Sequence, residues 1–226
     1  KSSESAQIGK YSVYMTDTNI KAEITSTRRA AIQRYTLPRR DDARIIIDLF
    51  TPNEYPHNLK DAVVTKVNEN EICGYATYYN AFTGYTLEQE YTLYFVLQFN
   101  KPFLAMNGWK NEDVKPVEGY IGGWNRNHDF LTQPEIFNNI SKLKGRGDAG
   151  VFLDFKTQEG EEILVRSGVS LVDLEGARKN LEQEIYKKTK INAKVNILDS
   201  LDEYTSKVQE LILNENDLIN KKIYSI

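Results

Sequence analysis

The chain has 226 residues, of which 40% are hydrophobic, so it can bury the core of one large all-β domain or of two small ones. Its formal net charge of −3 excludes the basic surface that nucleic-acid binding requires. Cys73 is the single cysteine, and the only histidines, His57 and His128, are far apart, which argues against a disulfide framework and a cysteine or histidine metal site. No apolar run approaches the ~20 residues of a membrane helix, so we expect no membrane span.

Short strands dominate the first two-thirds of the chain. Residues 20–27 place Ile20, Ala22 and Ile24 on one face and polar side chains on the other, which predicts a half-buried strand. Further predicted strands cover residues 11–15, 30–37, 44–50, 62–67, 71–79, 91–100, 149–156 and 161–172. Residues 44–50 are too apolar for an edge strand, so we place them in the centre of the sheet.

The strand pattern breaks between residues 101 and 147, where glycines, prolines and both tryptophans gather. A connection of this length is usually functional or disordered, and its aromatic content argues against plain disorder. We therefore expect a β-sandwich domain over residues 1–170 that carries a long loop at 101–147.

Helical periodicity replaces strand alternation in the last third. With Asp173 as N-cap, a helix would place Leu174, Ala177, Leu181 and Ile185 on one face. A second amphipathic helix, or two shorter ones, is predicted by Leu201, Tyr204, Val208, Leu211, Leu218 and Lys222. The predicted fold class is mainly β: a two-layer antiparallel β-sandwich with C-terminal α-helices in a helical segment or linker over 171–226.

Residues 123–130, GWNRNHDF, form the best candidate for a sugar-contacting loop. A tryptophan offers a flat apolar face and its polar neighbours offer hydrogen bonds, although most loop aromatics pack against their own domain. The alternative is therefore that Trp124 and Phe130 pin the loop to the sandwich. The candidate substrate-binding residues are Trp124, Asn125, Arg126, His128 and Trp109.

Asp48 and Asp154 each interrupt an apolar strand, so they are the acidic residues best suited to a fixed position. Glycoside hydrolysis needs two carboxylates ~5–10 Å apart. The alternative is that each aspartate points outward from a one-sided strand. The sequence contains no nucleophilic triad, phosphate loop or calcium-hand pattern, so we assign no catalytic residue and no metal ligand to this chain.

Four ordered blocks of sequence carry a resemblance to a known family. They are YSVYMTDTNIKAEITSTRRAAIQRYTLP with the following ARIIIDL, then YFVLQFNKPF, FLDFKTQEGEEILVRSGVSLV and EGARKNLEQEI. Together they cover residues 11–185 and resemble the N-terminal β-sandwich domain of family-92 glycoside hydrolases, the exo-acting α-mannosidases. The strand over residues 28–38 would then be scaffold, with polar side chains toward loops, linker or barrel.

The resemblance implies a sandwich that packs on a catalytic (α/α)6 barrel and shapes one wall of a glycan pocket. Catalysis in the family is calcium-dependent and inverting, with the catalytic groups and calcium contacts mainly in the barrel. This chain lacks the barrel and the family's early glycine- and histidine-rich loop, and Gln33 stands where a histidine is usual. No catalytic position carries over, so the chain alone is expected to be inactive and to bind no cofactor.

The expected function is thus the accessory N-terminal domain of an α-1,2-mannosidase-like glycoside hydrolase. Its expected partners are the catalytic barrel or a second copy of itself, and α-mannoside glycans. The chain begins at Lys1 without a methionine, which we interpret as a processed protein or a piece cut from a longer one. With the resemblance, this predicts a bacterial glycan-degrading protein that is secreted, periplasmic or on the cell surface.

Three other functions remain open at this stage. The first is a stand-alone carbohydrate-binding or adhesin-like module, with a groove lined by the tryptophans or by residues 75–85. The second is a complete small enzyme that uses the two aspartates or the histidine loop. The third is a structural protein that assembles through the apolar face of residues 201–223.

Overall fold

Antiparallel strands make up most of the computed structural model, which describes residues 3–50, 58–80, 89–112, 133–187 and 206. The strands are β1 (Glu4–Gln7), β2 (Lys10–Met15), β3 (Ile20–Ser26), β4 (Ala30–Leu37), β5 (Arg40–Asp48), β6 (Asn58–Asn68), β7 (Glu71–Asn80), β8 (Gln89–Phe99), β9 (Ala105–Asn111), β10 (Glu135–Phe137), β11 (Lys142–Thr157) and β12 (Glu161–Ser170). Helix α1 (Leu174–Leu181) and the π-helix η1 (Glu182–Lys187) follow. The predicted fold class, a mainly β antiparallel sandwich, is confirmed.

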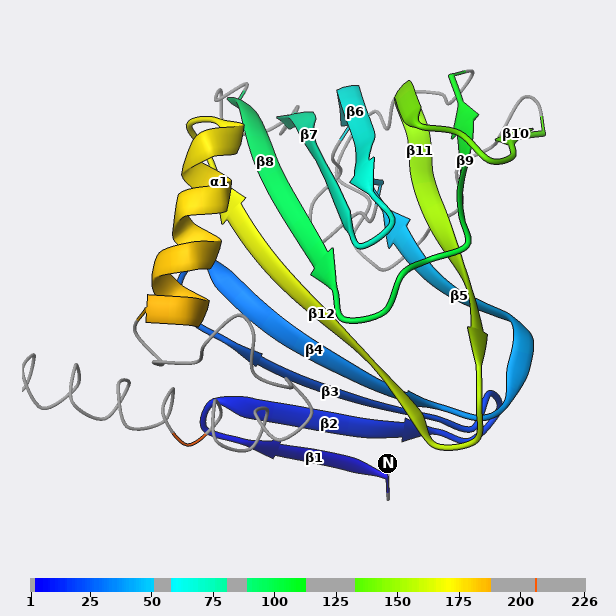
Figure 1. The fold of residues 1–226 in the computed structure, drawn as a ribbon. Helices are drawn as coiled ribbons and strands as arrows, with labels where there is room; N and C mark the ends of the chain where they lie inside the picture. Colours follow the sequence, from blue (N-terminus) through cyan, green and yellow to red (C-terminus); the bar gives the residue numbers. More distant parts are fainter. Residues whose placement is uncertain (1–2, 51–57, 81–88, 113–132, 188–205, 207–226) are drawn as a thin grey trace, which may run out of the picture.

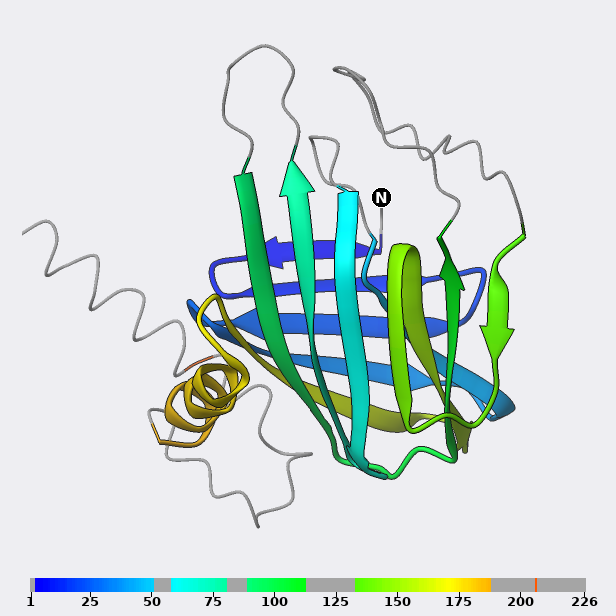
Figure 2. The ribbon, with the colours of Figure 1, turned by 90° about the horizontal axis from the view of Figure 1, so that it is seen from above.

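The described strands form one sheet in the order β1-β2-β3-β4-β12-β8-β7-β6-β11-β9-β10, and β5 pairs with β11 off this path (Figure 1). The sheet curls, so that β1 to β4 cross β7, β6 and β9 at a large angle (Figure 2). In such an orthogonal arrangement the two halves of the sheet face each other across a shared core.

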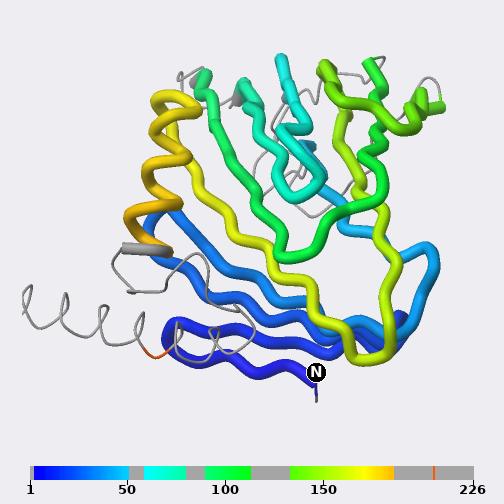
Figure 3. Tube along the Cα trace, viewed as in Figure 1, coloured from blue at the N-terminus to red at the C-terminus, as the bar shows by residue number. Residues whose placement is uncertain are grey.

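Strand β11 pairs with three strands, whereas β12 joins β4 to β8. Its first residues pair with β6, and from Gly147 onward it pairs with β9 and β5. Gly147 has a φ of 74°, a left-handed conformation that glycine adopts without steric cost. A Cβ on Gly145 would lie 2.8 Å from the Cβ of Ala149, so the strand bends sharply here (Figure 3). This bend lets one strand pair with β6 before it and with β9 and β5 after it.

The main hydrophobic core lies on the inner face of the curled sheet. Phe103, Phe155, Met106 and Ile163 are among its fully buried side chains. Phe99, Phe103 and Phe155 pack ring to ring, with centroids 5.9 to 6.4 Å apart. Full burial of one such side chain stabilises the fold by ~1.5–3 kcal/mol, so this cluster contributes strongly to the stability of the sandwich.

Helix α1 covers part of the outer face of the sheet, beside β8 and β12 (Figure 1). It begins at the predicted N-cap Asp173, whose Oδ1 accepts a hydrogen bond of 2.6 Å from the backbone N–H three residues on. Ala177, Leu181 and Ile185 are buried in a second cluster on β4, β12, β8 and β7, as their spacing predicts. Gly168 permits the close approach, because a Cβ there would lie 2.5 Å from the carbonyl oxygen of Ala177.

The structure differs from the expected loop over residues 101–147. Strands β9 and β10 and the beginning of β11 lie within this range. Residues 105–111 are rich in asparagine, glycine and lysine, which have low β-propensity, so their sequence gives no strand signal. These residues form a strand because they pair with β11 and β10, although their own β-propensity is low.

Two further expectations need correction. In the described part of the chain β5 pairs with β11 alone, so the central position expected for residues 44–50 is wrong. Ile45 and Ile47 pack on the core, whereas Ile46 is 65% exposed on the outer face. Strand β1 was not predicted, because its four residues show no apolar alternation. The second predicted helix lies outside the described residues except for Ser206, which is helical.

Candidate functional site

Several strand ends meet at one end of the sandwich, which we call the loop end. The register pairs Asn58 with Tyr79 and Asn80 with Gln89, so the ends of β6, β7 and β8 lie together. Gly147, in the bend of β11, pairs with both β6 and the last residue of β9. The described segments that end at residues 50, 80 and 112 therefore all end here, at the upper edge of the sandwich in Figure 2. Connections at one end of a rigid scaffold are frequent binding sites.

Four of the five predicted substrate-binding residues, Trp124, Asn125, Arg126 and His128, lie outside the described residues. The described residues that flank them, Glu112 and Gln133, border the loop end through β9 and β10. The structure thus places the attachment of this segment, and the role of its side chains stays a prediction.

Trp109, the fifth predicted residue, is half-buried on β9. Its Nε1 donates a hydrogen bond of 3.1 Å to Oδ1 of Asp148, which lies next to the bend of β11. The indole ring lies across Gly150 on β11, because a Cβ there would be only 2.2 Å from the ring. The absence of a side chain at Gly150 therefore lets the ring lie close to the backbone on the outer face of the sheet.

Other apolar side chains extend the outer face on both sides of Trp109. The register places Ile136 of β10 opposite Trp109, and Phe152 of β11 opposite Ile46 of β5. Ile46 is 65% and Ile136 is 54% exposed. The guanidinium of Arg44 lies 4.7 Å from the centre of the Phe152 ring. We call Ile46, Phe152, Trp109 and Ile136 the outer apolar patch; apolar side chains gathered on one face often mark interaction sites.

Asp48 and Asp154 share the outer face but do not form a catalytic pair. Asp48 is the register partner of Gly150, four residues from Asp154, which separates them by ~13 Å along the strand. Glycoside hydrolysis needs ~5–10 Å. Both carboxylates are also engaged: Asp154 accepts hydrogen bonds of 2.7 Å from Arg44 and from Asn107, and Asp48 accepts one of 2.9 Å from a backbone N–H. The hypothesis of a small enzyme using this pair is therefore wrong.

Tyr78 stiffens the loop end from the inner face. Its hydroxyl donates a hydrogen bond of 2.9 Å to the carbonyl oxygen of Leu49, and its ring centroid lies 5.3 Å from that of Tyr91. Burial, and to a smaller extent the nearby Tyr91 and Asp48, raise the pKa of Tyr78 to about 12. The phenol thus stays neutral and keeps β7 bonded to the end of β5.

A second aromatic surface lies on the outer face of β7 and β8. The rings of Tyr75 and Tyr94 are 5.8 Å apart, and the Tyr75 hydroxyl donates a hydrogen bond of 2.8 Å to Oδ2 of Asp61. This hydrogen bond, followed by burial, raises the pKa of Tyr75. Thr77 and Thr92 exchange a hydrogen bond of 2.8 Å beside it. Tyr75 belongs to the segment 75–85 that the sequence suggested for a binding groove.

Arg34 of β4 binds a buried carboxylate on the neighbouring strand β3. Its Nε donates a hydrogen bond of 2.7 Å to Oε2 of Glu23, a buried carboxylate on β3. Lys10 and Lys21 lie 3.3 and 3.2 Å from the other oxygen of Glu23. Burial acts to raise the pKa of Glu23, and the bonds from Arg34 and Lys21 outweigh it, so the pKa lies below its usual value. This group is structural and places paired charges on the outer face of β2 to β4.

Arg29 holds the C-terminal helix through a group that we call the Glu184 latch: Thr27, Arg29 and Glu184. The Thr27 hydroxyl and the backbone N–H of Arg29 both donate to Oε2 of Glu184, the latter at 3.1 Å. The Arg29 Nε donates to Oε1 at 2.8 Å. Burial acts to raise the pKa of Glu184, and these bonds together outweigh it and lower the pKa. Glu184 was not predicted as an important residue. The feature that could have identified it is its position three residues after Leu181, where a charged side chain falls within the apolar face of the helix.

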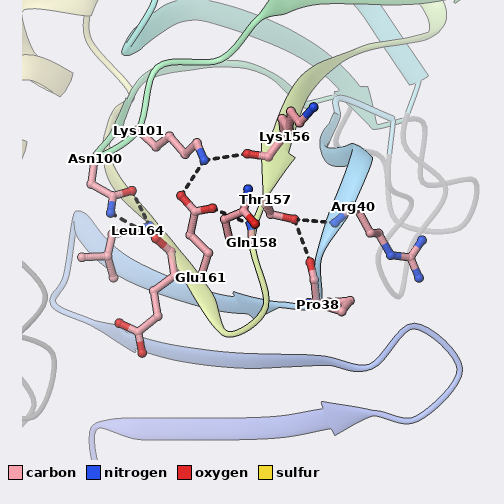
Figure 4. Close-up of polar contacts among 10 residues, drawn as sticks. Pro38, Arg40, Asn100, Lys101, Lys156, Thr157, Gln158, Glu161 and Leu164 are labelled. Carbon is pink, nitrogen blue, oxygen red and sulfur yellow. Dashed lines mark hydrogen bonds and ion pairs between the residues drawn. The ribbon is translucent and has the colours of Figure 1, made fainter.

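The end of the sandwich opposite the loop end is closed by a polar network (Figure 4). Lys101 Nζ donates to the carbonyl oxygen of Lys156 at 2.6 Å and to Glu161 Oε1 at 2.5 Å. The N–H of Gln158 donates to the other oxygen of Glu161 at 2.8 Å. Burial acts to raise the pKa of Glu161, but these bonds outweigh it and lower it. The segments NKPF and TQEGEE, which belong to two of the four family blocks, thus supply structural contacts between turns.

Among the described residues, no group of three or more histidine, cysteine, aspartate or glutamate side chains is placed to hold a metal ion. In the same part of the chain, no helix has the length and apolar character to cross a membrane.

Comparison with known proteins identifies the family. The model of the glycosyl hydrolase family 92 N-terminal domain matches residues 1–170, so the chain belongs to this family. A comparison with curated proteins finds no match. The chain is similar in fold to the family GH92 alpha-mannosidase BT3965 from Bacteroides thetaiotaomicron, with a TM-score of 0.64 and 24% identity. It is also similar to the inverting mannosidase BT2199 of the same organism (TM-score 0.61, 15% identity) and to the family glycosyl hydrolase ccman5 (0.63, 19%).

These matches cover most of this chain but little of the others. They span 93%, 92% and 92% of the chain, and 24%, 22% and 24% of the three solved structures, respectively. The chain therefore corresponds to about a quarter of each solved hydrolase, and to a part of the N-terminal domain. The resemblance found in the four sequence blocks is confirmed.

Proposed function

We propose that this chain is an accessory, non-catalytic part of an α-1,2-mannosidase-like hydrolase, which packs on a catalytic domain and shapes its glycan pocket. Family membership over residues 1–170 supports this, together with a length of about a quarter of the solved relatives. The described residues offer no carboxylate pair of the catalytic kind at Asp48 and Asp154. Hydrolysis, and the calcium it uses, then belong to the catalytic domain.

The outer apolar patch is the observation that carries the packing proposal. Ile46 and Ile136 are both more than half exposed, and Trp109 and Phe152 connect them across four strands. Burial of apolar area of this kind drives most association between protein surfaces. The patch also adjoins the loop end, where Glu112 and Gln133 flank the sequence that contains the predicted sugar-contacting residues.

The packing proposal is tested in a polypeptide that joins this domain to its catalytic domain. Ile46→Asp combined with Ile136→Asp should lower kcat/KM for an α-mannoside by about 30-fold, the loss expected for ~2 kcal/mol at a central contact. The control replaces two exposed apolar residues elsewhere, Val67→Asp and Leu171→Asp, and should leave activity unchanged. Equal activity of all three proteins would refute docking through the patch.

The non-catalytic role is tested on the chain itself by calorimetric titration with α-1,2-linked mannobiose, with and without calcium, followed by an assay for free mannose. Neither binding nor hydrolysis is expected. Released mannose would refute the proposal, because the catalytic groups would then lie in this chain. The proposed place of action is outside the cytoplasm of a bacterium, where glycan polymers are degraded.

A stand-alone carbohydrate-binding module is the second candidate, and the tyrosine surface on β7 and β8 favours it. Tyr75 and Tyr94 present aromatic rings beside Asp61 and two threonine hydroxyls on one rigid face. Aromatic faces with adjacent hydrogen-bonding groups suit sugar rings, which are apolar on their faces and polar at their edges. Binding without hydrolysis in the same titration, abolished by Tyr75→Ala, would favour this candidate over the accessory role.

A further inference from the structure

The two faces of strands β2 and β3 differ in a way that calls for a covering element. On the inner face the register aligns Tyr11, Val13 and Met15 of β2 with Ile24, Ala22 and Ile20 of β3. Tyr11 is 41% and Met15 is 38% exposed, and the other four side chains are half-buried. We call Tyr11, Val13, Met15, Ala22 and Ile24 the β2–β3 inner face.

The outer face of the same strands has no such requirement. Glu23 is bound there by Arg34, Lys10 and Lys21, and the Thr25 hydroxyl donates a hydrogen bond of 2.5 Å to a backbone carbonyl. Polar groups thus occupy the outer side, where they are satisfied, and apolar groups occupy the inner side, where part of their surface meets water. This alternation is typical of a strand whose inner side packs against another element.

The Glu184 latch brings the end of the described chain to this part of the sheet. Glu184 is bound by Thr27 and Arg29 in the β3–β4 turn, three residues before Lys187, where the described range 133–187 ends. Figure 1 shows this helix end beside the β3 and β4 ends of the sheet. The following chain therefore starts at the boundary between the polar outer face and the apolar inner face.

The sequence after Lys187 contains an apolar stripe that needs a partner. Val208, Leu211 and Leu218 recur at three- and seven-residue steps, in register with Leu201 and Tyr204. An isolated amphipathic helix is marginal in water, and most of its stability comes from packing its apolar face. Ser206, which lies off this stripe, is helical and exposed.

We propose that the C-terminal segment, residues 207–226, docks with its apolar stripe on the β2–β3 inner face and completes the sandwich there. The tether from Lys187 to Lys207 has 20 residues and spans up to ~66 Å when extended. Crossing two strand spacings of ~4.8 Å and one sheet thickness of ~10 Å requires far less. This inference concerns packing within the chain and does not depend on the proposed function.

The test measures how fast a small oxidant modifies Met15 and Tyr11 in the 226-residue chain. Docking should reduce the exposure of Met15 from 38% to the ~10% typical of packed residues. Its oxidation should then be about fourfold slower than that of a methionine that is 38% exposed. The pair Val208→Asp and Leu211→Asp should restore the fast rate. The control pair, Ser206→Asp and Asn220→Asp, adds the same charge away from the stripe and should keep the slow rate.

Hydrogen exchange in β7, around Ile72, verifies that every variant retains its fold, and sedimentation at two concentrations reports self-association. Slow oxidation that only the stripe variant accelerates supports the proposal. A fast rate in the unmodified chain overturns it, as does a slow rate that neither pair changes or that both pairs accelerate. Protection that appears only with a dimer also overturns it, because a second copy would then be the occupant.

Discussion

The Glu184 latch makes a sharp prediction about how the C-terminal helix is held on the sandwich. Glu184 is only 2% exposed, and it accepts hydrogen bonds from the Thr27 hydroxyl, from the backbone N–H of Arg29 and from the side chain of Arg29. Glu184→Ala removes all three acceptor contacts at once. It leaves the apolar packing of Leu181 and Ile185 in place.

The magnitude follows from the exposure of each donor. A hydrogen bond to a charged group contributes ~1.5–3 kcal/mol where it is shielded, which applies to the bonds from Thr27 and from the Arg29 backbone. The Arg29 side chain is more than half exposed, so solvent screens its bond to ~0.2–1 kcal/mol. Because part of the freed surface regains water, we expect Glu184→Ala to lower the free energy of unfolding by ~2–4 kcal/mol. Arg29→Ala should cost ~1 kcal/mol.

Urea unfolding at pH 7, followed by circular dichroism, measures this difference. Glu182→Ala is the matched control, because Glu182 is exposed on the same helical segment, and it should change stability by less than ~0.5 kcal/mol. If Glu184→Ala and Glu182→Ala had equal effects, the latch would contribute nothing and its assignment would be refuted.

The latch also predicts a pH dependence. The pKa of Glu184 is lower in the folded protein than its unfolded value of ~4.3, because the bonds from Thr27 and Arg29 outweigh burial. Its contribution is therefore fully present above that unfolded value and is lost as the pH falls through the lower folded pKa. The difference in the free energy of unfolding between the native chain and Glu184→Gln, measured by urea unfolding, should become smaller as the pH falls below about 5. A constant gap would contradict this reasoning.

Three further predictions concern other contacts. Gly168→Ala should destabilise the fold by ~1–3 kcal/mol and increase hydrogen exchange in α1, because its Cβ would lie 2.6 Å from that of Leu181; unchanged exchange would contradict the close approach. Lys101→Met should raise the pKa of Glu161 toward its usual value, detectable by carboxyl NMR titration, and cost ~1 kcal/mol; an unchanged titration would show that Lys101 does not hold this carboxylate. Absorbance titration of Tyr78, by difference from Tyr78→Phe, should show ionisation near pH 12; ionisation near pH 10 would contradict its burial.

Local patterns were sufficient for the elements whose signal lies in a few adjacent residues. The alternation around Ile24 predicts β3, and Asp173 followed by an apolar stripe predicts α1, because strand and helix periodicities are local properties of the chain. The four family blocks identified the domain, although two of them serve mainly to bind turns together around Lys101 and Glu161.

Long-range pairing decided what the sequence left open. Strand β9 has low β-propensity and exists because β11 and β10 supply its hydrogen bonds. The edge position of β5 and the exposure of Ile46 follow from the bend of β11, which no local pattern shows. The same register pairs Asp48 with Gly150, four residues from Asp154 on β11. The two carboxylates are therefore too far apart to act as a catalytic pair.

The sequence by itself determined the class of fold, the helix that follows it and the family. Only the tertiary structure decided which apolar residues remain exposed and which buried charges meet. Exposure depends on what covers a face, and the Arg29–Glu184 contact joins residues 155 positions apart, so neither is encoded in any short stretch of the chain.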